Sequence, residues 1–385
     1  MKKILLVSYY RFPDGDAGSV RQYALAKMFL KCGYDPLIVS MGAAEQGIKL
    51  HKGIPYVSLR NKRNGIIERI CNYLFFSFKL EKILKRFPEY HIIMFSDIPN
   101  SAIRLLIRKK KTKNYKLIYD CVEWYSKEQF KRGGYDLNYH KKDTLNRKII
   151  RKQVNIIAIS EFLEDYFSKK GCKTIRIPVI MEQEMYVEQS KMQHSKLTYI
   201  YAGSPGTKDY LGTIIGGFAK LNIEELKQVR FKIIGVDEEK LITLCRVDQD
   251  DLARVKGSME AYGRISRTEV LEEYKVSDFS ILLREENLRY AKAGFPTKVV
   301  ESLFCKTPVI CNISSDLAKY LNDGENSMIV ETCSSEGLAQ VLRKTLHISQ
   351  SKLKIMSEQA KKTAENNFDY RNYIDEMKCF LENII

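Results

Sequence analysis

Short apolar runs alternate with segments of helical periodicity along this chain, and no other sequence feature constrains the fold as strongly. In the first half, runs suited to buried strands lie at 3–8, 34–40, 91–95, 116–119 and 155–159. Helical segments separate them, as at 19–32, where Gly33 follows the last helical residue. Strands that alternate with helices build βαβ units around a parallel sheet. The sequence therefore predicts an α/β fold.

The second half repeats this pattern, with strand candidates at 197–202, 230–234, 259–262, 279–283 and 308–311. A chain of 385 residues is longer than one hydrophobic core usually serves. We predict an N-terminal domain at 1–185 and a C-terminal domain at 186–365, joined by the polar stretch 185–196. One long amphipathic helix is expected over 351–385, and its last part, 366–385, is expected to pack back on the N-terminal domain.

Positive charge is confined to the first half. Residues 1–185 carry 36 Lys and Arg against 18 Asp and Glu, whereas residues 186–385 carry 28 against 29. An excess of positive charge in one half of the chain favours an acidic surface as partner, either phospholipid head groups or nucleic-acid phosphate.

Two basic segments make the membrane the preferred partner. Ile66–Phe87 joins a strongly apolar side to several cations, and Arg108–Lys116 holds six cations in nine residues. An amphipathic helix beside a polybasic segment suits an anionic lipid surface. The alternative for Ile66–Phe87 is a helix that packs on the core and exposes a solvated face.

The cysteines and the hydropathy limit the location. None of the nine cysteines lies in a CxxC or zinc-ligand spacing, so we expect reduced cysteines in small core positions. No apolar run reaches the ~18 residues of a spanning helix, and the first apolar run is too short for a signal peptide. A cytoplasmic protein, peripheral on the inner face of the membrane, is expected.

Candidate ligand-binding residues follow the predicted strands, because parallel sheets bind ligands at the carboxyl ends of their strands. Pro296 and Thr297 begin a predicted helix whose first amides would point at a diphosphate. Glu301, one turn further on, would accept both hydroxyls of a ribose, or is a solvated surface residue. Gly203–Asp209 is glycine-rich with Lys208 near its end, which suits a phosphate or an ordinary turn.

These segments together resemble the retaining group 1 glycosyltransferases, family 4, which have the GT-B fold of two Rossmann-like domains facing across a cleft. The resemblance rests on Ser204 and Lys208, on Arg284, and on the run Gly294–Ile310. In the first half, Asp14–Arg21 is similar to the glycine-rich acceptor-side loop of the family. Segments 157–163 and 177–179 also follow the family in order, so the resemblance spans nearly the whole chain.

The resemblance implies roles for particular residues. Lys208 and Arg284 would neutralise the departing diphosphate, aided by the helix start at Thr297 and Lys298, and no metal or other cofactor is expected. No protein nucleophile is expected either. The donor site would comprise Gly203, Ser204, Phe295, Pro296, Thr297, Lys298 and Glu301. The acceptor-side loop would contribute Gly15, Gly18 and Arg21.

The chain departs from the family pattern at two positions. Ala293 replaces the first glutamate of the donor motif, so contacts to the sugar would pass to the backbone near Gly294 and Phe295, or to side chains at 285–287. A histidine that many members carry after an N-domain strand is absent, and Asp120 or Glu123 would take its place as a catalytic residue. An acidic helix cap is the alternative for both carboxylates.

The expected function is transfer of a sugar from a nucleotide-sugar donor to a lipid-linked or saccharide acceptor in capsule, exopolysaccharide or lipopolysaccharide synthesis. A basic nucleic-acid-binding protein is the first alternative, but no RRM, zinc-finger or helix-turn-helix signature is present, and we expect no nucleic-acid partner. A nucleotide-sugar epimerase on the same fold is the second. A dehydrogenase would need GxGxxG after its first strand, and Ser8–Gly18 lacks it.

Overall fold

The chain forms two compact units. The computed structural model describes residues 2–13, 17–42, 47–60, 66–186, 195–205, 208–245 and 247–384, apart from the side chains of Ile66, Arg69 and Leu244. Unit 1 comprises Met1–Glu182 with Asp369–Ile385, and unit 2 comprises Gln183–Phe368. Most of the expected linker lies outside the described residues.

Unit 1 is built on an eight-stranded sheet in the order β3-β4-β2-β1-β5-β6-β7-β8. All described neighbours are parallel except β3 and β4, which form an antiparallel pair at one edge. The strands are β1 Lys2–Ser8, β2 Tyr34–Ser40, β3 Lys49–His51, β4 Ile54–Ser58, β5 Ile92–Ser96, β6 Lys116–Cys121, β7 Asn155–Ala158 and β8 Thr174–Arg176.

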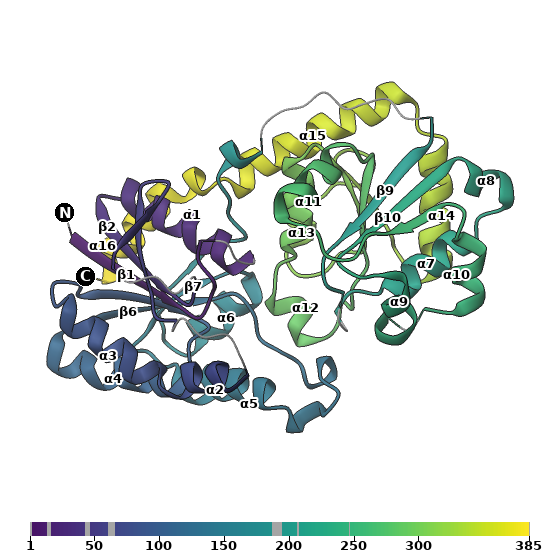
Figure 1. The fold of residues 1–385 in the computed structure, drawn as a ribbon. Coiled ribbons are helices and arrows are strands. Elements are labelled where there is room, and N and C mark those ends of the chain that lie inside the picture. The colour runs from purple at the N-terminus through teal and green to yellow at the C-terminus, as the bar shows by residue number, and fades with distance from the viewer. Residues whose placement is uncertain are drawn as a thin grey trace. The chain divides into compact units, whose positions relative to one another are not determined.

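Helices cover both faces of this sheet (Figure 1). They are α1 Ala17–Lys31, α2 Ile66–Leu74, α3 Phe76–Arg86, α4 Asn100–Lys113, α5 Leu137–Thr144, α6 Glu161–Lys169 and α16 Ile374–Ile384. Because both faces are covered, the central strands are apolar without alternation, as in Ile4–Val7 of β1, which is wholly buried. A π-helical turn, Leu145–Ile149, continues α5.

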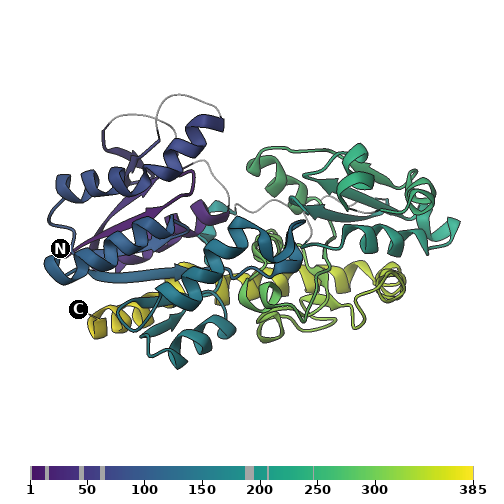
Figure 2. The ribbon, with the colours of Figure 1, turned by 90° about the horizontal axis from the view of Figure 1, so that it is seen from below.

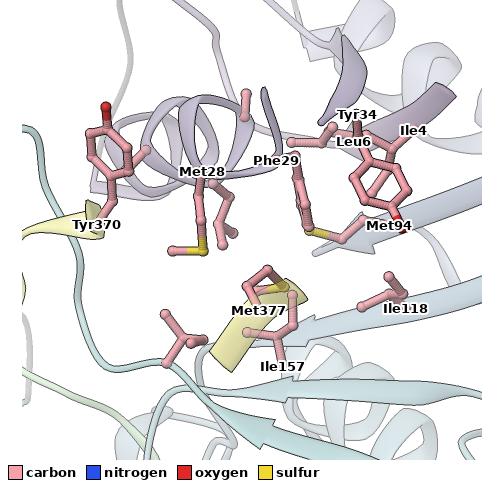
Figure 3. Close-up of a cluster of buried hydrophobic side chains, with 14 of the residues drawn as sticks. Ile4, Leu6, Met28, Phe29, Tyr34, Met94, Ile118, Ile157, Tyr370 and Met377 are labelled. Atoms are coloured by element: carbon pink, nitrogen blue, oxygen red, sulfur yellow. The ribbon is translucent and has the colours of Figure 1, made fainter. Parts of the chain in front are cut away.

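The end of the chain completes the core of unit 1. Met377 of α16 lies beside Met28 of α1 and the strand side chains Met94, Ile118 and Ile157 (Figure 3). Both ribbon views place the yellow C-terminal helix among the elements of this unit (Figures 1 and 2). Burial of these side chains ties the last residues to the first strand and helix.

Unit 2 is built on a six-stranded parallel sheet in the order β11-β10-β9-β12-β13-β14. Its strands are β9 Leu197–Ala202, β10 Val229–Ile234, β11 Met259–Ala261, β12 Phe279–Leu282, β13 Val309–Cys311 and β14 Ser327–Ile329. Its helices are α7 Leu211–Ala219, α8 Ile223–Lys227, α9 Glu238–Cys245, α10 Gln249–Val255, α11 Arg267–Lys275, α12 Arg289–Ala293, α13 Thr297–Phe304, α14 Ser335–Leu346 and α15 Gln350–Phe368.

Two predicted helices differ from the structure. The long helix expected over 351–385 is divided at Asp369, whose carboxylate accepts a hydrogen bond from the amide of Arg371 and caps a short 3₁₀ turn, Tyr370–Tyr373. Likewise, Ile66–Phe87 is two helices, α2 and α3, that meet at Phe75. Within the described residues, no helix combines the length and the apolar character that crossing a bilayer requires.

Candidate functional site

Three side chains of unit 2 converge on one carboxylate, that of Asp209. Asp209 follows β9, Arg284 follows β12, Lys298 lies in the first turn of α13, and Tyr201 lies within β9. Because β9 and β12 are neighbours in a parallel sheet, their carboxyl ends meet at the same edge. The sheet order therefore brings together residues that are far apart in the sequence.

Asp209 is the centre of this cluster. Nε of Arg284 donates to its Oδ1 over 2.6 Å, and the hydroxyl of Tyr201 donates to Oδ2 over 2.7 Å. Nζ of Lys298 also donates to Oδ2, and it lies 2.8 Å from the hydroxyl of Tyr201. We did not single out Asp209 from the sequence, where it is only the acidic residue after Lys208.

The cluster keeps Asp209 ionised and retains a positive excess. Burial by itself would raise the pKa of Asp209, but Arg284 and Lys298 outweigh burial and lower the pKa to about 2. Burial lowers the pKa of Lys298, against the opposing effect of Asp209. Two cations thus face one carboxylate, and the remaining positive charge suits an anionic ligand.

A glycine makes room for Lys298. Gly203 has a φ of +143°, and a Cβ placed on it would lie 2.3 Å from Cε of Lys298. Any side chain at this position would collide with the lysine that reaches Asp209. The glycine-rich segment after β9 therefore serves the cation cluster directly.

The neighbouring predicted residues lie at the edge of this cluster. Ser204 is exposed, and Lys208 is half-buried with its carbonyl oxygen 3.4 Å from the hydroxyl of Tyr290. Residues 206 and 207 lie outside the described residues. The structure thus brings Arg284 and Lys298 together, whereas the sequence analysis paired Arg284 with Lys208.

Glu301 lies one turn into α13 and is held by an arginine. Nε and Nη2 of Arg267 donate to Oε1 of Glu301 over 3.1 and 2.9 Å, and Nη2 also donates to the hydroxyl of Tyr186 over 3.0 Å. Burial raises the pKa of Glu301, against the lowering effect of Arg267. Within the described part of the chain, all its side-chain bonds use Oε1, so Oε2 remains available to a ligand.

Helix α13 begins where the sequence predicted a helix start. Pro296 is the N-cap residue and Thr297 the first helical residue, with no side-chain cap on the first amides. Phe295 packs edge-on against Tyr320 and Phe368, so its ring belongs to the core. A contact between Phe295 and the donor would therefore be made by its backbone and not by its ring.

The acidic residues considered as substitutes for the first family glutamate have partners within unit 2. Glu285 accepts a hydrogen bond from the hydroxyl of Tyr210 over 2.9 Å and from the amides of residues 286 and 287. Glu286 accepts from Nδ2 of Asn312 over 2.8 Å. These bonds order the loop that carries Arg284.

In unit 1, two of the predicted site residues form one buried ion pair. Nε of Arg21 lies 3.0 and 3.1 Å from the two carboxylate oxygens of Asp120, and Nη2 lies 2.9 Å from Oδ1. Both side chains are almost completely buried. A sugar hydroxyl would have to compete with this pair, which links α1 to the end of β6.

Gly18 and Glu123 are the other predicted residues of unit 1 that the structure describes. A Cβ on Gly18 would lie 2.5 Å from the ring of Tyr10, so glycine permits α1 to approach the end of β1. Gly15 lies outside the described residues. Glu123 is half-buried. Burial raises the pKa of Tyr125, and the negative charge of Glu123 raises it further.

Comparison with solved structures defines the class of fold. Sucrose-phosphate synthase from Thermosynechococcus elongatus is 12% identical, with a TM-score of 0.76 over 100% of this chain and 99% of that one. Anabaena HepE, solved with UDP and glucose, is 14% identical, with a TM-score of 0.68 over 100% of both chains. WaaG, a glycosyltransferase involved in lipopolysaccharide biosynthesis, is 16% identical, with a TM-score of 0.68 over 97% of this chain and 98% of that one. The two Rossmann-like units therefore have the GT-B fold, as expected.

A family model adds a more specific similarity for unit 2. Residues 182–363 match the model of the group 1 glycosyl transferases. This range contains the cation cluster and Glu301. A search of curated proteins finds no significant match.

Proposed function

We propose that the protein is a glycosyltransferase that moves a sugar from a nucleotide-sugar donor to a hydroxyl acceptor. The observation that carries this proposal is the convergence of Arg284 and Lys298 on Asp209 at the strand ends of unit 2. The match of this region to the group 1 family supports it, as does the similarity to HepE, whose structures contain UDP and UDP-glucose.

The donor would bind with its diphosphate at the cations and its ribose at Glu301. Arg284, Lys298 and Lys208 would supply positive charge, and the amides of Thr297 and Lys298 would add the dipole of α13. Oε2 of Glu301 would accept from the ribose hydroxyls while Arg267 holds Oε1. We propose that these fixed charges take the place of a metal ion.

The proposed transfer retains the configuration of the sugar. The bond from the sugar C1 to the diphosphate oxygen breaks, and the acceptor oxygen forms a bond to C1 on the same face. The acceptor proton passes to the departing diphosphate. The two cations stabilise the negative charge that develops on the leaving group.

The surface of unit 1 supports an acceptor held at an anionic membrane. Five apolar side chains of α2, α3 and the junction between them are each more than half exposed: Ile67, Ile70, Leu74, Phe75 and Phe78. We call these residues the apolar patch. Nζ of Lys82 lies 4.5 Å from the centroid of the Phe78 ring, and Arg104, Arg108, Lys111 and Lys113 of α4 are exposed. This combination suits insertion beside anionic head groups.

We further propose a place in the synthesis of a bacterial surface polysaccharide, with a lipid-linked or saccharide acceptor. A basic surface alone would also suit nucleic acid. The exposed apolar side chains favour the membrane, because a phosphate backbone gains nothing from them.

Nucleotide binding without metal tests the donor half of this proposal. Thermal unfolding would be followed in EDTA with UDP, GDP, ADP, CMP and the corresponding nucleotide sugars. At least one diphosphate should raise the melting temperature, because a ligand of the folded state stabilises it by mass action. Glu301→Gln should reduce that shift. No shift with any nucleotide, or a shift only with Mg²⁺ or Mn²⁺, would contradict the proposed site.

A further inference from the structure

Two adjacent lysines of α5 lie near the end of β5 in unit 1, beside the segment that holds Asp120 and Glu123. Nζ of Lys141 lies 3.4 Å from Oδ1 of Asp97, and Nζ of Lys142 lies 3.9 Å from the same atom. Asp97 follows β5 with a φ of +45°, which is uncommon for a residue with a side chain. Two ammonium groups thus share one carboxylate.

Lys142 is the unusual member of this cluster. Its side chain is only 3% exposed. The 3.9 Å between its Nζ and Oδ1 of Asp97 is nevertheless too long for a hydrogen bond. Among the described residues, its Nζ donates no hydrogen bond, and it lies 5.8 Å from the centroid of the Tyr119 ring. A lysine side chain this buried usually has a hydrogen-bonded partner, because loss of hydration is costly.

Lys141, Lys142 and Asp97 together carry one positive charge, and one further carboxylate, Glu123, lies in the surroundings. Burial raises the pKa of the Cys121 thiol to about 11, against the lowering effect of Lys142, so the thiol remains neutral. Asp120 is engaged by Arg21. Burial also lowers the pKa of Lys141, with Asp97 opposing that effect. Glu123 is a further nearby carboxylate. Burial raises the pKa of Tyr10, and the charges of Asp97, Asp120 and Glu123 raise it further, so these carboxylates surround the same hydroxyl.

The cluster opens toward the apolar patch. Lys141 and Asp97 are 19% and 39% exposed, so exposure rises from Lys142 outward. Nζ of Lys141 lies 5.3 Å from the ring of Tyr73, which belongs to α2 and is 38% exposed. Ile70 of the apolar patch lies one turn before Tyr73 in α2, on the same face of that helix. An anion at the lysines would therefore sit beside a surface suited to a hydrocarbon chain.

We propose that Lys141 and Lys142 form a binding site for the phosphate of a lipid-linked acceptor, whose hydrocarbon chain lies along the apolar patch. Asp97 occupies this site in the absence of the ligand and turns to solvent when phosphate binds. The shared chemistry is a phosphate or diphosphate ester, and the apolar patch commits the site to a lipid source. This inference rests on the proposed function, because it names the acceptor of the same transfer.

Titration calorimetry with inorganic pyrophosphate tests the lysine site. The Arg284→Met/Lys298→Met variant, in EDTA, is the background, because it lacks the two donor cations that converge on Asp209. The lysine site should still bind pyrophosphate. Lys142→Met should weaken this binding at least about tenfold, as loss of a charged hydrogen bond does. Lys148→Met, which removes an exposed cation from the next turn, should leave it unchanged.

Asp97→Asn gives an independent test with the opposite sign. Asparagine tolerates the left-handed backbone, and the change removes the competing charge. Pyrophosphate should therefore bind about fivefold more tightly, as expected when a nearby like charge is lost. Unchanged or weaker binding by Asp97→Asn, or unchanged binding by Lys142→Met, would overturn the phosphate site. Donor binding by the otherwise unaltered protein is measured separately, so failure of the donor site is distinguishable from failure here.

Farnesyl diphosphate distinguishes a lipid from a free anion. If the acceptor is lipid-linked, farnesyl diphosphate should bind at least about tenfold more tightly than pyrophosphate, since burial of a few methylene groups suffices for this gain. Phe75→Ser/Phe78→Ser should remove the difference and leave pyrophosphate binding intact. Equal affinities for the two compounds in the protein with an intact apolar patch would overturn the lipid assignment.

Discussion

Nε of Arg284 donates to Oδ1 of Asp209 over 2.6 Å, while Lys298 binds the other oxygen of the same carboxylate. In this arrangement one buried aspartate holds two cations from different segments at the end of the sheet. A bound diphosphate would find these cations already placed, with little side-chain entropy left to lose.

Removal of either cation should weaken diphosphate binding selectively. Arg284→Met and Lys298→Met should each lower the affinity for UDP, or for whichever diphosphate binds best, by about tenfold to a hundredfold. The affinity for the matching nucleoside should change little, because it lacks the diphosphate. Calorimetric titration measures both, and Lys292→Met is the control at an exposed position of α12. Equal losses for the nucleoside and the diphosphate would show that the cations act elsewhere.

Asp209 should make the free energy of unfolding depend on pH in the acidic range. Its pKa of about 2 in the folded protein is lower than the ordinary value of 3.8, so its ionised form stabilises the fold above pH ~4. This stabilisation, about 2 kcal/mol, is lost as the pH falls from about 4 to about 2. The difference in unfolding free energy between the wild type and Asp209→Asn should therefore shrink over this range in urea titrations. A difference that is the same at pH 6 and pH 2.5 would contradict the assignment.

The pair of Arg21 and Asp120 should be a major source of stability in unit 1. Asp120→Ala leaves the buried guanidinium of Arg21 without its carboxylate, with only the carbonyls of Ile177 and Pro178 as acceptors, and loss of one partner of a buried ion pair typically costs about 3–5 kcal/mol. Arg176→Ala breaks the half-exposed contact with Glu161 and should cost at most about 1 kcal/mol. Urea unfolding of the two variants provides the comparison. Similar losses would mean that Arg21 and Asp120 are not coupled as the structure indicates.

Membrane binding should depend on the exposed cations of α4, and not on those cations of α4 that already have partners within unit 1. Lys109 pairs with Glu81 over 2.8 Å, and Lys110 donates to the carbonyl of Gln153 over 2.7 Å, so both have partners within unit 1. Replacement of Arg108, Lys111 and Lys113 by Ser should reduce sedimentation with vesicles of phosphatidylglycerol and phosphatidylcholine. Each cation near the surface contributes about 1 kcal/mol, and the loss should be smaller in high salt.

Neutral vesicles and duplex DNA serve as the comparisons for that experiment. Phosphatidylcholine alone should bind the protein weakly, because it lacks the negative surface potential. Tighter binding to duplex DNA than to anionic vesicles would favour the nucleic-acid alternative.

The sequence was sufficient to predict the α/β class and most of the strands. Long apolar runs such as Ile4–Val7 identify strands that are buried on both faces. The strands β3, β4, β8 and β14 were missed. They are three to five residues long and lie at or beside an edge of their sheet. The break at Asp369 was missed because the apolar spacing continues across it, whereas the capping bond depends on the conformation of the backbone.

The site could be predicted only in part. Lys298 and Arg284 follow recognisable strand and helix boundaries, but their common partner Asp209 depends on β9 and β12 being neighbours. An acidic residue directly after Lys208 at a strand end was the only available signal. Lys141 and Lys142 gave no signal at all, because a polar helix with two lysines is ordinary until its burial is known.

Transfer of the sugar itself is the most direct test of the proposed function. The protein would be incubated in EDTA with the radiolabelled nucleotide sugar whose diphosphate binds best, together with a bacterial lipid extract. We expect label to enter the lipid phase, and Arg284→Met/Lys298→Met to abolish this transfer although the variant remains folded. Label that stays in the water phase with every stabilising nucleotide sugar and with both lipid and saccharide acceptors, or transfer that persists in the double variant, would contradict the account.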